Sequence, residues 1–410
     1  MIARKFLIVA MILTMIFSTA CARSKKIPEP DCVLIPDPNY VSEEKVEIRG
    51  VWFSFYDWLD LPRDEIAFRQ ATSNIMNQLQ SRGLNSIFVH VHSHSDSYYP
   101  SEYFPPSKFA TGSMWRGFEF DPLKIFIDEA HQHGIQFHAW LNPYRVTSTN
   151  SPALQVTWDE IPESSIVKIW RNSSPNQRFV LYHNGQYYLN PANEEVVKYL
   201  TDSITELVKN YDVDGIHFDD YFYPSVSDSN FDRPDYDNSY VDASISQWRR
   251  DNVSGLIRSV YLAVKNEKPN VKFGISPAGN LDHLRSDSQY FTDIDRWMSE
   301  PGFIDYILPQ IYWGFDLRNG DGSLSKYAFE NCLNDWLSIP RDSSVDFYVG
   351  LALYKTGRNN DEWIYNHDII AREIQSIRNK NLGGFVLFDY RNLFDSESAD
   401  EVQNMVNILQ

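Results

Sequence analysis

An alternation of strand and helix patterns, repeated from about residue 47 to the C-terminus, restricts the fold of this chain more than any other feature. Short apolar segments alternate with longer segments in which apolar residues recur every three or four positions, as in Val196, Leu200, Ile204 and Leu207. The strands are predicted over residues 48–55, 86–92, 135–141, 213–219, 271–276, 304–312, 347–354 and 383–389. Helices are predicted over residues 63–82, 122–133, 194–210, 245–267, 287–300, 326–337, 362–380 and 399–409.

Eight such units predict an α/β protein whose parallel strands close into a (β/α)8 barrel. The longest connections follow the second, third and fourth strands, over residues 93–121, 142–193 and 221–243. An open doubly wound sheet is the alternative, but the Gly-rich phosphate turn of that fold is missing after the first strand. We therefore expect one folded domain, residues 46–410, with long loops on one rim and no cofactor.

The first 21 residues have the pattern of an export signal. Arg4 and Lys5 precede an apolar run, residues 6–17, that is too short to span a bilayer. Small residues then lead to Cys21, which resembles a lipobox cysteine that is lipidated in bacteria; cleavage near Ala20 is the alternative. We expect a lipid anchor at Cys21 on a bacterial membrane, facing the periplasm, and a flexible tether over residues 22–45.

Composition narrows the class of ligand. The formal charge of −18 argues against nucleic acid, because a phosphate backbone needs a basic surface. Aromatic residues make up 15 %, with 24 Tyr and 11 Trp. Flat rings with polar rims suit sugar rings, although they also suit a large core.

The most informative local stretch is residues 211–224, where a short apolar run ends on two acids, Asp219 and Asp220. Strand alternation places His217, Asp219 and Tyr221 on one face. Burying acids in a core is costly, so this strand end is predicted to open on a ligand site at the carboxyl end of a barrel. A helix N-cap is the alternative, but it explains one Asp and not a pair.

Other predicted strands also end in polar or aromatic residues, which predicts a lined pocket. The third strand runs into His138-Ala-Trp-Leu-Asn-Pro-Tyr-Arg145, and the second contains His90 and His92. The sixth ends near Gln310-Ile-Tyr-Trp313, and the eighth ends at Asp389.

These blocks resemble the bacterial glycosyl-hydrolase-like family ten. The resemblance covers about residues 47–389 and is carried by Arg49-Gly-Val-Trp52, His138-Ala-Trp-Leu-Asn-Pro-Tyr-Arg145, Tyr188-Leu-Asn-Pro191, Asp214-Gly-Ile-His-Phe-Asp-Asp-Tyr221, Phe273-Gly-Ile-Ser-Pro277 and Pro309-Gln-Ile-Tyr-Trp313. It implies a (β/α)8 barrel that hydrolyses glycosidic bonds. Some lipoprotein members act on peptidoglycan glycan strands without stem peptides, which agrees with a lipidated Cys21. The block around Asp219 is also similar to the chitinase signature, with Tyr221 in place of its catalytic Glu.

Glycoside hydrolysis normally uses two carboxyl groups. Asp219 is the first candidate and Asp220 the second; a partner from another strand or loop would be Asp389, Asp316, Glu300, Asp96 or Asp57, with Asp389 preferred because it ends a strand. His138 and Asn142 are predicted to bind sugar hydroxyl or acetamido groups, and Arg145 to bind a carboxylate such as the lactyl group of muramic acid. The remaining predicted substrate contacts are Trp140, Tyr144, His217, Tyr221, Gln310, Tyr312 and Trp313; for each aromatic ring, core packing is the alternative.

Two other functions remain open. His90, His92, His138, Asp219 and Asp389 could gather zinc on a barrel, although strands five and six contribute no His. A sugar-binding lipoprotein without turnover would keep the pocket and lack a competent acid pair. The principal expectation is a glycoside hydrolase without a metal.

Overall fold

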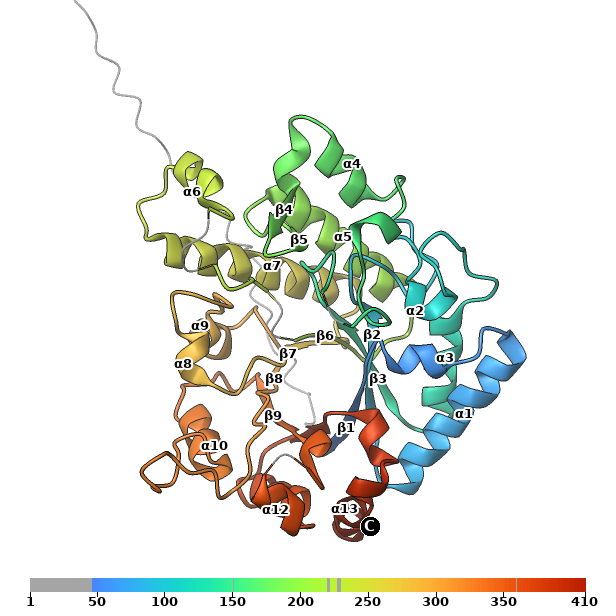
Figure 1. Cartoon of the computed structure of the whole chain (residues 1–410), viewed down its shortest axis with the longest axis vertical. Helices are drawn as coiled ribbons and strands as arrows, with labels where there is room; N and C mark the ends of the chain where they lie inside the picture. Colours follow the sequence, from blue (N-terminus) through green and yellow to red (C-terminus); the bar gives the residue numbers. More distant parts are fainter. Residues whose placement is uncertain (1–45, 150, 220–221, 227–229, 359) are drawn as a thin grey trace, which may run out of the picture. The chain divides into compact units, whose positions relative to one another are not determined.

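The computed structural model describes residues 46–149, 151–219, 222–226, 230–358 and 360–410. Residues 46–410 form one compact unit. Its centre is a closed barrel of eight parallel strands, which confirms the predicted (β/α)8 fold (Figure 1). The strands are β1 (Ile48–Phe53), β2 (Ser86–His92), β3 (Gln136–Leu141), β6 (Gly215–Phe218), β7 (Lys272–Ile275), β8 (Tyr306–Ile307), β9 (Asp346–Leu351) and β10 (Gly384–Leu387).

The first strand, β1, closes the barrel by pairing with both β2 and β10. Large side chains fill the barrel interior, among them Trp52, Phe88, Tyr306 and Tyr348. Gly274 on β7 makes room for one of them, because a Cβ at this position would lie 2.3 Å from the Tyr306 ring. The barrel interior is therefore a packed core, and a cavity can form only beyond the last layer of these side chains.

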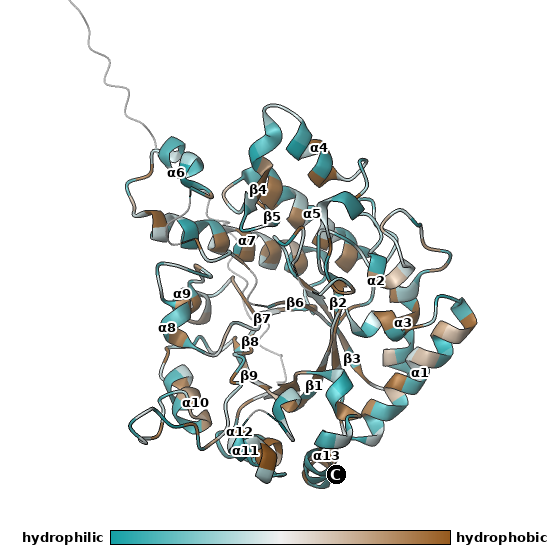
Figure 2. Cartoon of the chain, in the orientation of Figure 1, coloured by the Kyte–Doolittle hydropathy of each residue, from teal (hydrophilic) through white to brown (hydrophobic). Residues whose placement is uncertain are grey.

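Helices surround the barrel with their apolar faces inward. The long ones are α1 (Glu65–Ser81), α3 (Pro122–Gln132), α5 (Glu194–Asn210), α7 (Ile245–Glu267), α12 (Ile369–Asn379) and α13 (Ala399–Leu409). Side chains of Asp64, Asp121, Asn193 and Ser244 accept hydrogen bonds from backbone N–H groups in the first turns of α1, α3, α5 and α7. Figure 2 shows mostly hydrophobic strands within helices that are hydrophilic over much of their outer surface.

Three predicted elements are shorter than expected. The predicted helix over 362–380 is two helices, α11 (Asp361–Tyr365) and α12, because Asn366 is extended and its Nδ2 donates to the Glu362 carbonyl at 2.8 Å. The predicted helix over 287–300 is only α9 (Ile294–Ser299), preceded by the separate α8 (Leu281–Leu284). The sixth strand is limited to β8, since Pro309 has no N–H to donate; Gln310 then pairs only through isolated bridges.

The predicted long loops carry small elements of their own. The connection after β2 contains α2 (Lys108–Thr111), and that after β6 contains α6 (Arg233–Ser239). The connection after β3 contains α4 (Ile166–Asn172) and a hairpin of β4 (Val180–His183) and β5 (Gln186–Leu189), green in Figure 1. The helix α10 (Phe329–Leu337) follows β8. Within the described ranges, no helix combines the length and apolar composition needed to cross a membrane.

Candidate active site

A cavity of about 370 Å³ lies where the carboxyl ends of the strands meet. Each barrel strand, or the residues directly after it, contributes to the lining. The lining residues are Trp52, Ser54, Phe55, Tyr56, His90, Trp140, Arg145, Leu154, Asp219, Ser276, Gln310, Tyr312, Tyr354 and Phe388. The cavity is thus mostly aromatic with a few convergent polar groups, as expected for a small-ligand site.

Asp219 follows β6 and is 4 % exposed. Its Oδ2 accepts hydrogen bonds from Trp140 Nε1, at 3.1 Å, and from Asn142 Nδ2. Trp140 is on β3 and Asn142 directly follows it, so the strand next to β6 holds the carboxylate in one orientation. Asp219 is the only carboxylate among the described residues that line this cavity.

Asn142 connects Asp219 to a cation and a neutral ring. Its Oδ1 accepts from Arg145 Nη2 and from His90 Nε2, the latter at 2.9 Å. His90 Nδ1 accepts from the Phe55 N–H at 3.2 Å, which requires the tautomer with its proton on Nε2. Burial, and then the charge of Arg145, hold the pKa of His90 well below its usual value. The ring also stacks on Trp140, with 3.3 Å between centroids.

His138 and His217 lie in the barrel interior and do not line the cavity. His217 is fully buried; it accepts from Trp52 Nε1 at 3.2 Å and contacts Ser276 Oγ and the Tyr306 hydroxyl, each at 3.0 Å. His138 stacks on Phe88 at 4.3 Å, and burial lowers its pKa to about 4. His217 thus supports two residues of the cavity lining, Trp52 and Ser276, from below.

Among the other residues predicted to bind substrate, Trp140, Arg145, Gln310 and Tyr312 line the cavity, and Gln310 Nε2 donates to the Ser276 carbonyl at 2.9 Å. Tyr144 is fully buried in the outer core. Trp313 stacks on Tyr327 at 5.4 Å, outside the lining. Asp220, Tyr221 and Cys21 lie outside the described residues.

The candidates for a second carboxyl separate into two groups. Asp96 accepts from the Ser93 and His94 N–H groups at 2.8 Å and holds a turn, while Asp316 and Glu300 are surface residues paired with Arg318 and Arg296. Asp57 and Asp389 instead lie near the cavity, behind Tyr56.

Tyr56 links the cavity to these two buried acids. Its hydroxyl donates to Asp389, which is 4 % exposed. Asp57 accepts from the Ser54 N–H at 2.6 Å and faces Arg391 Nε at 2.9 Å. Burial, and then the charge of Asp389, raise the pKa of Asp57 to about 8. Burial therefore disfavours the charged form of Asp57, while the Ser54 N–H and Arg391 favour it.

Sequence reasoning did not single out Tyr56, Ser54, Phe55, Tyr354 or Phe388 as site residues. The available signal was position alone, because each comes at or just after the end of a barrel strand. In the described part of the chain, no three or more His, Cys, Asp or Glu residues are grouped so that they could hold a metal ion.

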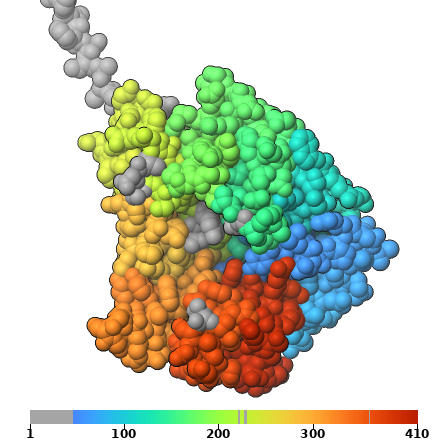
Figure 3. Space-filling model, in the orientation of Figure 1, coloured from blue at the N-terminus to red at the C-terminus, as the bar shows by residue number. Residues whose placement is uncertain are grey.

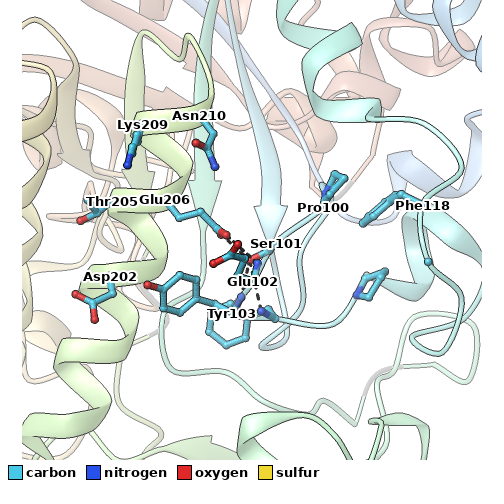
Figure 4. Close-up of a pocket in the computed structure, with 13 residues that line it drawn as sticks. Pro100, Ser101, Glu102, Tyr103, Phe118, Asp202, Thr205, Glu206, Lys209 and Asn210 are labelled. Atoms are coloured by element: carbon cyan, nitrogen blue, oxygen red, sulfur yellow. Dashed lines mark hydrogen bonds between the residues drawn. The ribbon is translucent and has the colours of Figure 1, made fainter.

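A larger cavity, of about 770 Å³, lies outside the barrel between α5 and the connection after β2 (Figure 4). It shares no lining residue with the Asp219 cavity. Glu206 on its wall accepts from Ser101 Oγ at 2.6 Å and from the Glu102 N–H at 2.8 Å, so this carboxylate fastens the loop to α5.

A closed α/β barrel with a carboxylate and aromatic rings at its strand ends has the architecture of the glycoside hydrolases built on this fold. The chain belongs to the family described as Glycosyl hydrolase-like 10, which it matches over residues 47–365. The family expected from the sequence blocks is thereby confirmed.

Two curated relatives agree with this assignment. The chain is 30 % identical to the glycosyl hydrolase DigH of Escherichia coli K12 over 419 aligned positions, which cover 92 % of both proteins. It is 31 % identical to the glycosyl hydrolase YngK of Bacillus subtilis over 336 positions, or 77 % of this chain and 62 % of YngK. The chain thus spans less than two thirds of YngK and nearly all of DigH.

Solved structures show the same fold at low identity. The catalytic domain of β-amylase from Paenibacillus polymyxa superposes with a TM-score of 0.57 at 10 % identity, covering 89 % of this chain and 100 % of that one. The glycoside hydrolase domain of PgaB (BpsB) from Bordetella bronchiseptica gives 0.55 at 12 %, covering 89 % and 99 %.

Proposed function

We propose that the chain is a glycoside hydrolase that cleaves glycosidic bonds in peptidoglycan glycan strands without stem peptides. One observation carries the proposal: Asp219 is held by Trp140 and Asn142 inside a sugar-sized cavity that is lined by residues of the barrel strands or of the segments that follow them. Family membership supports the reaction class. The substrate rests on the resemblance to lipoprotein members of the family and on the chemistry of the cavity.

In this mechanism Asp219 faces the scissile bond. Its hydrogen bonds to Trp140 and Asn142 orient the carboxylate before substrate arrives, so little reorganisation is needed during the reaction. Arg145 and His90 hold Asn142 in turn. The side chains of Phe55, Trp140 and Tyr312 offer ring faces on which a sugar can stack.

Asp389 is the proposed second carboxyl, acting through the Tyr56 hydroxyl. Burial and the nearby Asp389 charge raise the pKa of Tyr56 well above its usual value, so the phenol keeps its proton and donates a hydrogen bond to Asp389. Asp220, outside the described residues, is the alternative; because adjacent strand residues point to opposite faces, it could pair with Asp219 only if the backbone turns between them.

The proposed location follows from the N-terminal signal. Lipidation of Cys21 would anchor the barrel to a membrane through residues 22–45, facing the periplasm, where glycan strands are present. Labelling with a radioactive or clickable fatty acid, compared between the wild type and Cys21→Ser, tests this anchor.

The activity is tested by incubating the purified chain with peptide-free glycan strands and measuring new reducing ends. We expect Asp219→Asn to reduce turnover at least 100-fold, about the contribution of one catalytic carboxyl. The melting temperature should change little, because the Asn amide oxygen can still accept from Trp140 and Asn142. Asp316→Asn, at an exposed acid paired with Arg318, is the matched control.

Full turnover in Asp219→Asn would remove Asp219 from the reaction.

A second function, sugar binding without turnover, is favoured by one observation: Asp219 is the only carboxylate among the described lining residues. Binding of glycan strands by the wild type, without new reducing ends from pH 4 to 8, would support that function instead.

A further inference from the structure

A second cavity, of about 380 Å³, meets the Asp219 cavity at Arg145, which lines both. Its other walls come from the β4–β5 hairpin and from the segments that follow β6 and β7. The residues that matter here are Gln186, Tyr188, Tyr223, Ser225 and Tyr290. We propose that this cavity is a subsite for the neighbouring sugar of a glycan chain that carries carboxylate groups, with one carboxylate at Arg145. This inference rests on the proposed function and names the substrate class more closely.

The hairpin is fastened to the chain segment that carries Arg145. Leu189 N–H donates to the Tyr144 carbonyl at 2.8 Å, and Val146 N–H donates to the Tyr187 carbonyl at 3.1 Å. Alternation along β5 sends Tyr187 to the outer face, where it stacks on Trp158 at 4.1 Å. Gln186 and Tyr188 are therefore left on the cavity side, joined by a hydrogen bond from the Tyr188 hydroxyl to Gln186 Oε1 at 3.0 Å.

The wall formed by the segments after β6 and β7 is supported by buried side chains outside the cavity. Arg249 on α7 lies over the rings of Phe291, at 4.9 Å, and Tyr223, at 5.9 Å. Its guanidinium pairs with Asp232, at 2.9 Å from Nε to Oδ2, and both side chains are almost fully buried. Tyr290 and Phe291 adopt positive φ values of 60° and 52°, which bulky residues hold only where their surroundings enforce it. The wall is thus preformed.

The two walls are also tied to each other. Arg178, just before β4, donates from Nε to Asp235 Oδ1 of α6 at 3.0 Å. Figure 3 shows the green segment of the hairpin next to the yellow-green segment that contains α6. A cavity held between two connected insertions keeps its shape without ligand, which lowers the entropy cost of binding.

The chemistry of this cavity suits an anionic sugar. Tyr188 and Tyr223 offer aromatic surface, and Gln186 and His183 offer polar groups for hydroxyl and amide contacts. Arg145 places its positive charge at the junction; its guanidinium is held there by hydrogen bonds from Nε to the Ser93 carbonyl, at 2.8 Å, and from Nη2 to Asn142, and its backbone is bridged to Tyr188. A glycan with a carboxylate on alternate sugars, as in GlcNAc–MurNAc repeats, would place a sugar in each cavity and an anion beside Arg145.

The experiment compares ligands of two lengths on the full chain. A peptide-free GlcNAc–MurNAc glycan of six sugars is the substrate and the single sugar GlcNAc is a competitive inhibitor; both are tested with Tyr188→Ala, and with Gln186→Ala in case the first variant fails to fold. We expect kcat/KM on the six-sugar glycan to fall about tenfold and the inhibition constant of GlcNAc to stay unchanged, because one sugar fills only the Asp219 cavity. Tyr182→Ala is the matched control, since this Tyr is 55 % exposed on the same hairpin and lines neither cavity.

Calorimetry on Asp219→Asn separates this inference from the proposed function, because it needs no turnover. We expect the six-sugar glycan to bind more tightly than the single sugar GlcNAc, and more tightly than the same glycan with its carboxyl groups reduced to alcohols. Absence of hydrolysis by the wild type would defeat the proposed function alone. Equal affinity for both lengths, or equal behaviour of Tyr188→Ala, Gln186→Ala and Tyr182→Ala, would overturn the subsite.

Discussion

The Asn142 side-chain amide forms hydrogen bonds with an acid (Asp219), a neutral imidazole (His90) and a cation (Arg145). Its two polar ends have fixed roles, since Nδ2 donates to Asp219 while Oδ1 accepts from His90 and Arg145. The neutral His90 ring supplies a donor without a second positive charge. The rotamer of Asp219 therefore depends on side chains from β2 and from the segment that follows β3.

Tyr56 is the residue by which the proposed role of Asp389 can be tested. Tyr56→Phe keeps the ring in the cavity wall and removes the hydrogen bond to Asp389. We expect kcat to fall about 100-fold, a typical contribution of one proton-transfer group, with nearly unchanged melting. Steady-state kinetics on peptide-free glycan strands measures the effect.

Tyr390→Phe is the control for that variant, because the Tyr390 hydroxyl bonds to Gln78 on the outer side of the barrel, at 3.1 Å. Unchanged kcat in Tyr56→Phe would leave Asp389 without a route to the reaction and would shift attention to Asp220.

At the scale of elements, β7 depends on a glycine for close packing. A Cβ at Gly274 would lie 2.3 Å from the Tyr306 ring, whose hydroxyl contacts His217 under the cavity. We expect Gly274→Ala to lower the free energy of unfolding by about 1–3 kcal/mol, as overpacking of a filled core does. Urea unfolding followed by tryptophan fluorescence measures the change.

Gly255 provides the opposite case for this experiment. It lies on the exposed side of α7, and an added Cβ meets nothing within 4 Å. Gly255→Ala should therefore stabilise the chain by roughly 0.5–1 kcal/mol, because alanine loses less backbone entropy in a helix. Equal effects of the two substitutions would contradict the close approach at β7.

At the scale of the whole molecule, the packing of α13 against α12 buries acids in the outer layer. Glu401 on α13 accepts from the Ile370 N–H at 2.5 Å, and Glu373 on α12 is fully buried. Burial raises the pKa of Glu401 from 4.5 to about 7. The folded chain therefore binds a proton that the unfolded chain releases at lower pH.

Stability should follow the protonation of Glu401. The contribution is complete below pH 4.5 and is lost as the pH rises to about 7, because the folded state then gives up the proton it favours. Relative to Glu401→Gln, the wild type should lose up to about 3 kcal/mol of unfolding free energy between pH 4.5 and 7.5. Urea unfolding at both values measures this difference.

Glu195→Gln, at an exposed acid on α5, serves as the control and should show no such dependence. A parallel pH dependence of Glu401→Gln and the wild type would mean that Glu401 carries its charge in the folded chain.

Local patterns in the sequence determine much of the barrel. The helices α5 and α7 begin and end where their periodicity predicts, and the acids after Phe218 mark the carboxyl end of β6. Periodicity is a local property, since side chains on one face of a helix or strand share an environment whatever the fold. The break at Asn366 is harder to predict, because it depends on a side chain competing with the helix backbone.

The position of each inward-pointing side chain along the barrel axis was decided by the tertiary structure. Alternation predicts that His138, Trp140 and His217 point inward, yet only Trp140 reaches the cavity, while both histidines are buried beneath it. A period of two distinguishes inside from outside, whereas the stagger of neighbouring strands sets the height of each side chain along the barrel axis. The contact of Tyr56 with Asp389, 333 positions apart, likewise exists only because β1 pairs with β10 and closes the ring.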